Sequence, residues 1–283
     1  MRTVRIAGVP EHFNLPWHLC IENGEFEEVG IDLQWTDVPE GTGKMCQLLR
    51  DNETDIAVIL TEGIVKDIVG GNPSSIVQVY VESPLIWGIH VAAKSQYQTL
   101  ADLENTKVAI SRYGSGSHLM AYVNAQNQQW NTEALQFEVV NTIDGAVTAL
   151  TNGTADYFMW ERFMTQPLVD KGVFRRIADC PTPWPCFVIA VRNAFLASHP
   201  QTVALLLEII NHTTIEFKDI PSIDRTLASK YHQKLEDIQT WLSLTKWSQK
   251  PLEEKVLNKI QNQLFDLKII DKKGTFAEMV KAI

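Results

Sequence analysis

A regular alternation of short apolar strands and helices in the first third of the chain most constrains its fold. Residues 4–9 and 31–37 carry apolar side chains in strand-like order. The run DIAVIL at residues 55–60 is apolar without interruption after its aspartate, which is typical of a central strand covered on both faces. Segments with apolar residues at helical spacing separate these strands, and Pro16 suits the first turn of one such helix. The alternation predicts an α/β domain with a parallel sheet and right-handed crossovers.

Three short polar loops follow the predicted strands, with the sequences EHFNLP, PEGTG and TEG. Ligands of such sheets bind beyond the carboxyl ends of the strands. PEGTGK lacks the spacing of a nucleotide-binding loop, and an ordinary turn with a helix cap explains it equally well. Thr61 is expected to cap the helix that follows its strand. The candidate ligand-binding residues in and beside these loops are His12, Asn14, Trp17, Gly41, Thr42, Thr61 and Glu62.

The middle third repeats the same plan. KVAIS and TADYFMW are expected to be strands, with a helix after the loop RYGSGS, and the chain returns through the strand PTPWPCFVIAV. From about residue 199 onward the pattern is helical. We therefore expect residues 88–186 to form a second lobe inserted into a first lobe of residues 1–87, which residues 187–283 complete with a helical tail. The two crossings would act as a hinge.

Two long segments carry a resemblance to a known family. GIHVAAKSQYQTLADLENTKVAISRYGSGSH and TALTNGTADYFMWERFMTQPLVDKGVFRRIADCPTPWPCFVIAVRNAFLASHP resemble the second domain of type II periplasmic binding proteins. The similarity is to the branch that binds nitrate, sulfonates, taurine and thiamine precursors for ABC transporters. This resemblance implies a two-lobed, Venus-flytrap α/β fold that closes on a small molecule in the cleft between its lobes.

The loop RYGSGSH is the strongest local signal for a ligand. Its small residues leave backbone N–H groups and a helix N-terminus free to face an anion, and the arginine adds a positive charge. In the resembled family this loop often holds the acidic end of the ligand. The alternative is a simple helix cap by one of the serines. The candidates from this loop are Arg112, Tyr113, Ser115, Gly116, Ser117 and His118.

Two glutamates occupy equivalent places after a strand. Glu62 follows DIAVIL and a threonine, while Trp160 and Glu161 follow TADYFM. A site for bare nitrate or sulfate would not include a carboxylate, so the pair favours an organic ligand with a cationic or hydrogen-bond-donating group. Alternatively, each glutamate lies in a first helical turn, where it interacts with the helix dipole.

Aromatic residues offer stacking surfaces for a planar ligand. Trp184 and Trp87 lie at the predicted crossings, whereas Trp35, Trp241 and Trp247 are expected in the core. We expect His12 to be a surface or loop histidine, because no carboxylate partner identifies it as a catalytic base. Trp184 and Trp160 are therefore also candidate ligand-binding residues.

Composition excludes several classes of function. A net charge of −9 argues against nucleic-acid binding. The four cysteines lack zinc-ligand spacing and are expected to be free thiols, and no metal, cofactor or membrane span is expected. The N-terminal segment lacks the apolar stretch of a secretion signal. We therefore expect a monomeric protein that is cytoplasmic, or periplasmic or lipid-anchored if a signal has been removed.

These observations favour a non-catalytic solute-binding protein, with the resemblance implying the membrane subunits of an ABC importer as partners. The alternative is a cytoplasmic enzyme of the same fold, similar to menaquinone-pathway lyases or the thiamine pyrimidine synthase. Glu62, Glu161, His12 or His118 would then provide acid–base groups, although the synthase's cysteine-rich iron motif is absent. A transcription-factor effector domain is disfavoured, since no helix-turn-helix precedes Val4.

Overall fold

The computed structural model describes all residues from 1 to 283, and the chain divides into two compact units. The first unit consists of Met1–Ser83 and Trp184–Ile283, and the second of Pro84–Pro183. The sequence pattern placed these borders after residues 87 and 186. The second unit is thus a single segment, and the first is made of the two segments on either side of it. Each unit is described by itself below.

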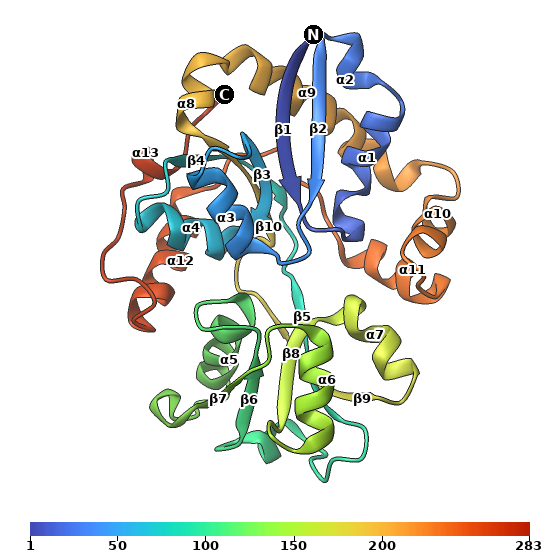
Figure 1. The fold of residues 1–283 in the computed structure, drawn as a ribbon, viewed down its shortest axis with the longest axis vertical. Coiled ribbons are helices and arrows are strands. Elements are labelled where there is room, and N and C mark those ends of the chain that lie inside the picture. Colours follow the sequence, from blue (N-terminus) through green and yellow to red (C-terminus); the bar gives the residue numbers. More distant parts are fainter. The chain divides into compact units, whose positions relative to one another are not determined.

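The first unit has a five-stranded sheet in the order β2-β1-β3-β10-β4. The strands are β1 (Arg2–Gly8), β2 (Ile31–Asp37), β3 (Ile56–Leu60), β4 (Ser74–Val81) and β10 (Phe187–Arg192). β1 is parallel to β2 and β3, as Figure 1 shows for the two blue arrows of β1 and β2. β10 is antiparallel to both β3 and β4. Strands β1 to β4 thus all run in one direction, as predicted for the first third of the chain, and the strand that returns from the second unit runs against them.

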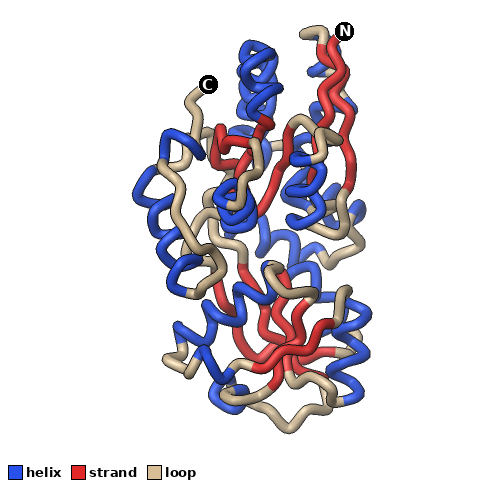
Figure 2. Tube along the Cα trace, turned by 60° about the vertical axis from the view of Figure 1, so that its left-hand side comes forward, coloured by secondary structure: helices blue, strands red, loops and turns tan.

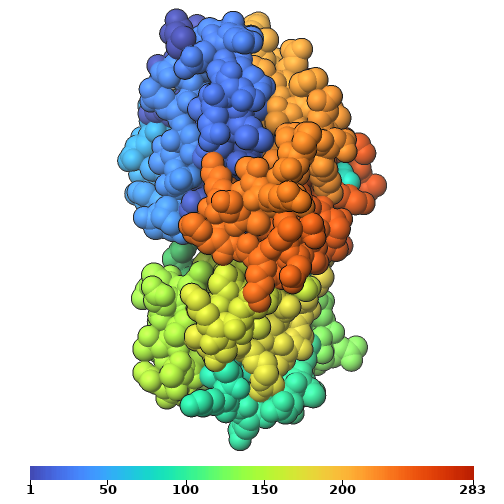
Figure 3. Space-filling view, turned by 90° about the vertical axis from the view of Figure 1, so that its right-hand side faces the viewer, coloured from blue at the N-terminus to red at the C-terminus, as the bar shows by residue number.

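Helices of the first unit come from both ends of the chain. The N-terminal set is α1 (Leu15–Glu22), α2 (Glu25–Glu28), α3 (Thr42–Arg50) and α4 (Thr61–Val69), preceded by the 3-10 turn η1 (His12–Asn14). The C-terminal set is α8 (Asn193–Ser198), α9 (Pro200–Glu216), α10 (Ile223–Lys230), α11 (Leu235–Leu244), α12 (Glu254–Asp266) and α13 (Phe276–Met279), with the 3-10 turn η4 (Phe217–Asp219). In the space-filling view the orange C-terminal residues lie directly against the blue N-terminal ones (Figure 3). The helical tail is thus part of the first unit.

The second unit has a five-stranded sheet in the order β7-β6-β8-β5-β9. Its strands are β5 (Ile86–Ala92), β6 (Lys107–Ile110), β7 (Gln136–Val139), β8 (Tyr157–Glu161) and β9 (Phe174–Pro181). Its helices are α5 (Gly116–Asn127), α6 (Ile143–Asn152) and α7 (Arg162–Asp170), with the 3-10 turns η2 (Leu100–Leu103) and η3 (Thr132–Ala134). Figure 2 shows the red strands of this unit with blue helices on either side. β5 is antiparallel to both of its neighbours, β8 and β9, so it alone runs against the other strands of this sheet.

The core of each unit lies on its central strands. In the first unit β3 and β10 are buried along almost their whole length, because helices cover both faces of an apolar strand pair. All four cysteines are buried and free, as the sequence predicted, with Cys180 in the second unit and Cys186 in the first. None of the helices is long and apolar enough to span a membrane.

Candidate functional site

The carboxyl ends of β1, β2 and β3 lie at one edge of the first unit's sheet, because the three strands are parallel. β10 runs the other way and begins at this same edge, where Phe187 pairs with Leu60. Four segments therefore meet there: the loop and 3-10 turn after β1, the loop after β2, the start of α4 after β3, and the segment that enters β10. We call this place the strand-end site.

Direct contacts join α4 to the segment that enters β10. The Thr61 hydroxyl donates to the carbonyl oxygen of Pro185 at 2.7 Å, and the Thr61 amide donates to the carbonyl of Cys186 at 3.1 Å. Leu60 occupies the N-cap position of α4 and Thr61 is the first helical residue. The expectation that Thr61 caps this helix was therefore wrong, because its hydroxyl is engaged by the returning chain.

Glu62 is the most unusual side chain of the strand-end site. It is 2% exposed, its Oε2 accepts a hydrogen bond from the indole Nε1 of Trp184 at 2.8 Å, and its Oε1 has no partner. Burial raises the pKa of the Glu62 carboxyl to about 7, and the Trp184 N–H and the Glu62 backbone N–H only partly oppose that shift. No lysine, arginine or histidine forms an ion pair with it. The site thus holds a buried carboxyl group that lacks a cation.

The loop after β2 packs directly onto the start of α4. Gly41 has a φ of +77° and is the N-cap of α3, so a glycine suits this position. A Cβ placed on Gly63 would lie 2.2 Å from the Cγ2 atom of Thr42, which shows that the threonine side chain covers Gly63. The hydroxyl of Thr42 is buried and has no partner. A second polar atom at this edge is therefore available to a ligand.

The loop and turn after β1 bring two further buried polar residues to this edge. Asn14 donates through Nδ2 to the carbonyl of Val9 at 2.8 Å, and its Oδ1 has no partner. His12 is fully buried against the rings of Phe13, Tyr231 and Trp241. His12 was expected at the surface or in a loop; it lies in the turn after β1 but is buried, so the surface alternative was wrong.

Burial also fixes the charge of the His12 ring. Its Nε2 atom lies 3.3 Å from Nε2 of Gln233, and the two side chains form a hydrogen bond. Nδ1 has no partner. Desolvation lowers the pKa of His12 to about 3, so the imidazole is neutral at physiological pH.

Trp17 lies in the aromatic core of the first unit. It is fully buried in α1, with its ring near those of Phe26, Trp35 and Tyr80 at centroid distances of 6.0 to 6.2 Å. These contacts explain the place of Trp17 in the core without a ligand. The structure thus places Trp17 with the core tryptophans rather than with the polar atoms of the strand-end site.

The serine loop of the second unit, residues 111–118, has mostly satisfied hydroxyl groups. Ser115 is the N-cap of α5 and accepts from the His118 amide at 3.4 Å. Ser117 accepts from the Ser111 amide at 2.9 Å, and its Oγ lies 3.1 Å from that of Ser115. Gly116 begins the helix. The cap expected as the alternative for this loop is present, and the three buried hydroxyls bond to one another.

Charged and aromatic side chains of the serine loop face solvent. Arg112 is exposed and makes no ion pair, and Tyr113 is 65% exposed. His118 accepts from the Gly114 amide at 3.0 Å through Nδ1, and its ring meets those of Tyr113 and Phe137 edge-on. The guanidinium of Arg112 is thus available for an acidic group.

Glu161 differs from Glu62 despite its similar place in the sequence. Glu161 is the N-cap of α7, and its Oε2 accepts from the Met164 amide at 2.6 Å. Trp160 stacks on Phe158 at 5.4 Å and meets Trp87 edge-on at 6.3 Å. The carboxylate therefore has a structural role in starting α7, which corresponds to the helix-terminus alternative.

Several residues of the strand-end site had no sequence signal. Tyr231, Gln233 and Trp241 contact His12 from a segment more than two hundred positions away. Trp184 was expected as a stacking surface, whereas its N–H donates to Glu62. No local pattern predicts a contact between residues so far apart.

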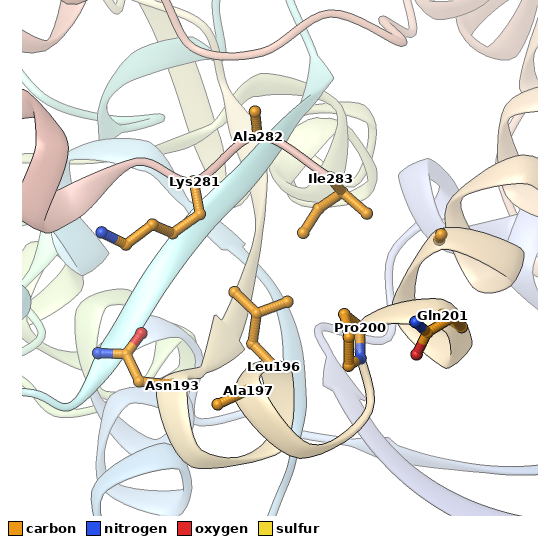
Figure 4. A pocket seen from close by; sticks show the side chains of 9 residues that line it. Asn193, Leu196, Ala197, Pro200, Gln201, Lys281, Ala282 and Ile283 are labelled. Carbon is orange, nitrogen blue, oxygen red and sulfur yellow. The ribbon is translucent and has the colours of Figure 1, made fainter.

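No metal centre is found in the structure. No group of histidine, cysteine, aspartate or glutamate side chains has a metal-binding arrangement. An open groove of about 610 Å³ lies between Leu196, Ala197 and Pro200 on one side and Lys281, Ala282 and Ile283 on the other (Figure 4). α8 follows the end of β10, which pairs with the start of β3, so this groove is at the opposite edge of the sheet from the strand-end site.

Comparisons with known proteins agree with this geometry. Residues 87–180 match the family model of Ca3427-like PBP. The Candida albicans CA3427 gene product, described as having the generic periplasmic binding protein fold, aligns with a TM-score of 0.89 at 23% identity over 99% of this chain and 96% of its own. No curated protein matches the sequence.

Two bacterial sulfonate-binding proteins are also similar in structure. SsuA from Xanthomonas axonopodis pv. citri, bound to MOPS, aligns with a TM-score of 0.84 at 15% identity over 100% of this chain and 99% of its own. SsuA from Escherichia coli aligns with a TM-score of 0.79 at 16% identity over 99% and 92%. The chain therefore has the α/β fold of type II periplasmic binding proteins. Within that class its fold is related to those of the CA3427 gene product and of the sulfonate-binding proteins.

Proposed function

We propose that this chain is a solute-binding protein that captures a small polar organic or anionic molecule in a cleft of its fold, as the substrate-binding component of an ABC importer. One observation carries the proposal: buried polar atoms of Glu62, Thr42 and Asn14 lack partners at the strand-end site. Each such atom costs about 1–3 kcal/mol when it is left without a hydrogen bond. A bound polar molecule would remove that cost.

The location of these atoms supports a ligand rather than a packing defect. Sheets of this kind bind small molecules beyond the carboxyl ends of their parallel strands. These three atoms come from the segments after β1, β2 and β3, at the edge where those strands end. Proteins with similar folds include a sulfonate-binding protein bound to MOPS, so the fold is suited to small polar solutes.

The serine loop supports an acidic group on the ligand. Arg112 is exposed without an ion-pair partner beside the N-terminus of the 12-residue helix α5, and both features favour anions. Arg112→Ala should therefore weaken the binding of an acidic ligand by about 2 kcal/mol, because a charge-assisted contact is lost. Isothermal titration calorimetry measures this change, and unchanged affinity would show that Arg112 does not bind the ligand.

A second candidate is an enzyme on the same fold. The observation that favours it is Glu62, whose pKa is raised to about 7, the range in which a carboxyl group both accepts and donates protons near neutral pH. His12 does not complete an acid–base pair, since its ring contacts aromatic groups and Gln233. Turnover of the bound molecule would favour this candidate over a binding protein.

The deciding experiment is native mass spectrometry of the purified protein, followed by thermal-shift screening of alkanesulfonates, nitrate, pyrimidines and amino-acid-like acids. A binding protein releases its ligand unchanged and shows a melting temperature that rises with ligand concentration. Chemical conversion of a screened compound would replace the binding role by the enzymatic one. The absence of any bound or stabilising compound would contradict both.

A further inference from the structure

Glu62 has no counter-charge anywhere in the structure. Its only side-chain partner is the neutral indole of Trp184, and the remaining groups that affect it are its own backbone N–H and the low polarity of its surroundings. The ion pairs of the first unit use other carboxylates, among them Asp55 and Asp67. A buried carboxylate without a cation is costly, and proteins retain one where a ligand supplies the missing charge or hydrogen.

Trp184 holds Glu62 in one orientation. The indole N–H is a donor only, so it occupies Oε2 and leaves Oε1 for another group. Trp184 lies between Pro183 and Pro185, which restrict the backbone on both sides of it. The carbonyl of Pro185 is held in turn by the hydroxyl of Thr61, the residue before Glu62. Two hydrogen bonds, one between the side chains of Trp184 and Glu62 and one between the neighbouring residues Pro185 and Thr61, therefore join the two segments.

The free oxygen of Glu62 selects for a hydrogen-bond donor. The hydroxyl of Thr42, whose methyl group covers Gly63, adds a second atom able to accept a hydrogen bond. A sulfonate or nitrate oxygen placed against the Glu62 carboxylate would be repelled. An ammonium, amidinium or ring amino group would bond to it and neutralise it.

From this geometry we infer that the strand-end site takes the nitrogen end of an amine-bearing solute, with Glu62 Oε1 as its acceptor and Trp184 as a positioning residue. This inference rests on the proposed solute-binding function and adds the class of solute. It separates two ends of a ligand: the basic or N–H-bearing end belongs at Glu62, and an acidic end does not.

The test uses matched pairs of probes that differ in one nitrogen group: taurine and ethanesulfonate, β-alanine and propionate, 4-aminopyrimidine and pyrimidine. Calorimetry at about pH 8, where Glu62 is mostly ionised, measures the ratio of affinities within each pair for the wild-type protein. The variants are Glu62→Gln and Trp184→Phe, and Glu208→Gln on the exposed face of α9 is the matched control for loss of one charge.

We expect the wild-type protein to bind the nitrogen-bearing member of at least one pair about tenfold more tightly than its partner, the value of one charge-assisted hydrogen bond. Glu62→Gln should reduce this ratio to less than about threefold, and Glu208→Gln should leave it unchanged. Trp184→Phe keeps the ring and removes the N–H. It should lower the ratio as well, whereas a merely structural defect would weaken both members of a pair equally.

Three outcomes overturn the inference. In the first, the nitrogen-bearing probes bind no better than their partners or do not bind at all. In the second, a co-purified ligand without an N–H group stabilises the protein. In the third, Glu62→Gln keeps the wild-type ratio of affinities while circular dichroism shows that the variant is folded. These results leave the solute-binding function intact if the wild-type protein carries or is stabilised by some other molecule. If no molecule binds, the solute-binding proposal itself fails.

Discussion

Glu62 in the first unit and Glu161 in the second lie where a buried strand passes into a helix, yet their carboxyl groups have different roles. Glu161 accepts a hydrogen bond at 2.6 Å from the Met164 amide of its own helix. Glu62 bonds to Trp184, 122 positions away in the chain, and keeps an oxygen without a partner. The same sequence pattern thus gives a helix cap in one unit and a candidate ligand acceptor in the other.

A shift of position relative to the helix explains this difference. Glu161 is the N-cap of α7, from which a side chain reaches the free N–H groups of the first turn. Glu62 is already the second residue of α4, whose N-cap is Leu60, and its carboxyl group accepts a hydrogen bond from Trp184 instead of capping the helix. The strand-end site therefore keeps unsatisfied polar atoms, while the serine loop of the second unit satisfies its own.

The largest expected consequence is acid sensitivity that arises in the first unit. The pKa of His12 is lowered to about 3 from an ordinary value of 6.5, so stability from the neutral ring is complete above pH 6.5 and is lost as the pH falls toward 3. The loss amounts to roughly 5 kcal/mol of unfolding free energy. Urea unfolding between these pH values should show this slope in the wild-type protein and lose it in His12→Gln. The exposed His212→Gln serves as control, and an unchanged slope in His12→Gln would contradict the assignment.

The contribution of Glu62 to stability should depend on pH in the opposite direction to that of His12, and Glu62→Gln should reveal it. The pKa of Glu62 is raised from an ordinary 4.5 to about 7, so ionisation costs stability progressively as the pH rises through this range. The glutamine variant should therefore be no more stable than wild type near pH 4.5 and up to roughly 3 kcal/mol more stable above pH 7. Thermal unfolding at the two pH values measures the difference. A destabilised variant at high pH would mean that the ionised carboxylate is satisfied in the free protein.

Crowding between the first turns of α3 and α4 at the strand-end site is testable by a double-mutant cycle. Gly63→Ala places a methyl group where the Cγ2 atom of Thr42 lies, and should destabilise the first unit by roughly 2 kcal/mol. Thr42→Ser removes that methyl group and should recover about 1 kcal/mol of the loss. Additive effects of the two substitutions in urea unfolding would show that the side chains do not touch.

The smallest effect belongs to the second unit. Glu161→Ala removes the cap of α7 and should destabilise the protein by about 1 kcal/mol. Its sign is opposite to that of Glu62→Gln above pH 7, and this contrast sharpens the comparison between the two glutamates. If both variants change the unfolding free energy in the same direction in chemical unfolding at about pH 8, the two glutamates do not differ in role.

The sequence predicted the elements more completely than the site. Apolar runs such as 56–60 identify buried strands, but the direction of the strand at 187–192 depends on where the chain re-enters the first unit, which no local pattern encodes. In the sequence, Glu62 and Glu161 have the same spacing from the apolar runs that precede them. This equal spacing conceals that the two glutamates occupy different positions relative to the start of the helix. The bond from Trp184 to Glu62 joins distant segments, so only the folded structure reveals it.

The most direct test is a pH titration of the Glu62 carboxyl group in the free protein. Its ¹³C NMR signal is identified as the carboxyl signal that disappears in Glu62→Gln. We predict titration at about pH 7 in the free protein and a downward shift of at least about one pH unit when an amine-bearing probe binds, because the cation stabilises the ionised form. Titration near the ordinary value of 4.5, unaltered by every amine probe, would contradict the claim that Glu62 is a buried carboxyl group awaiting a ligand's nitrogen.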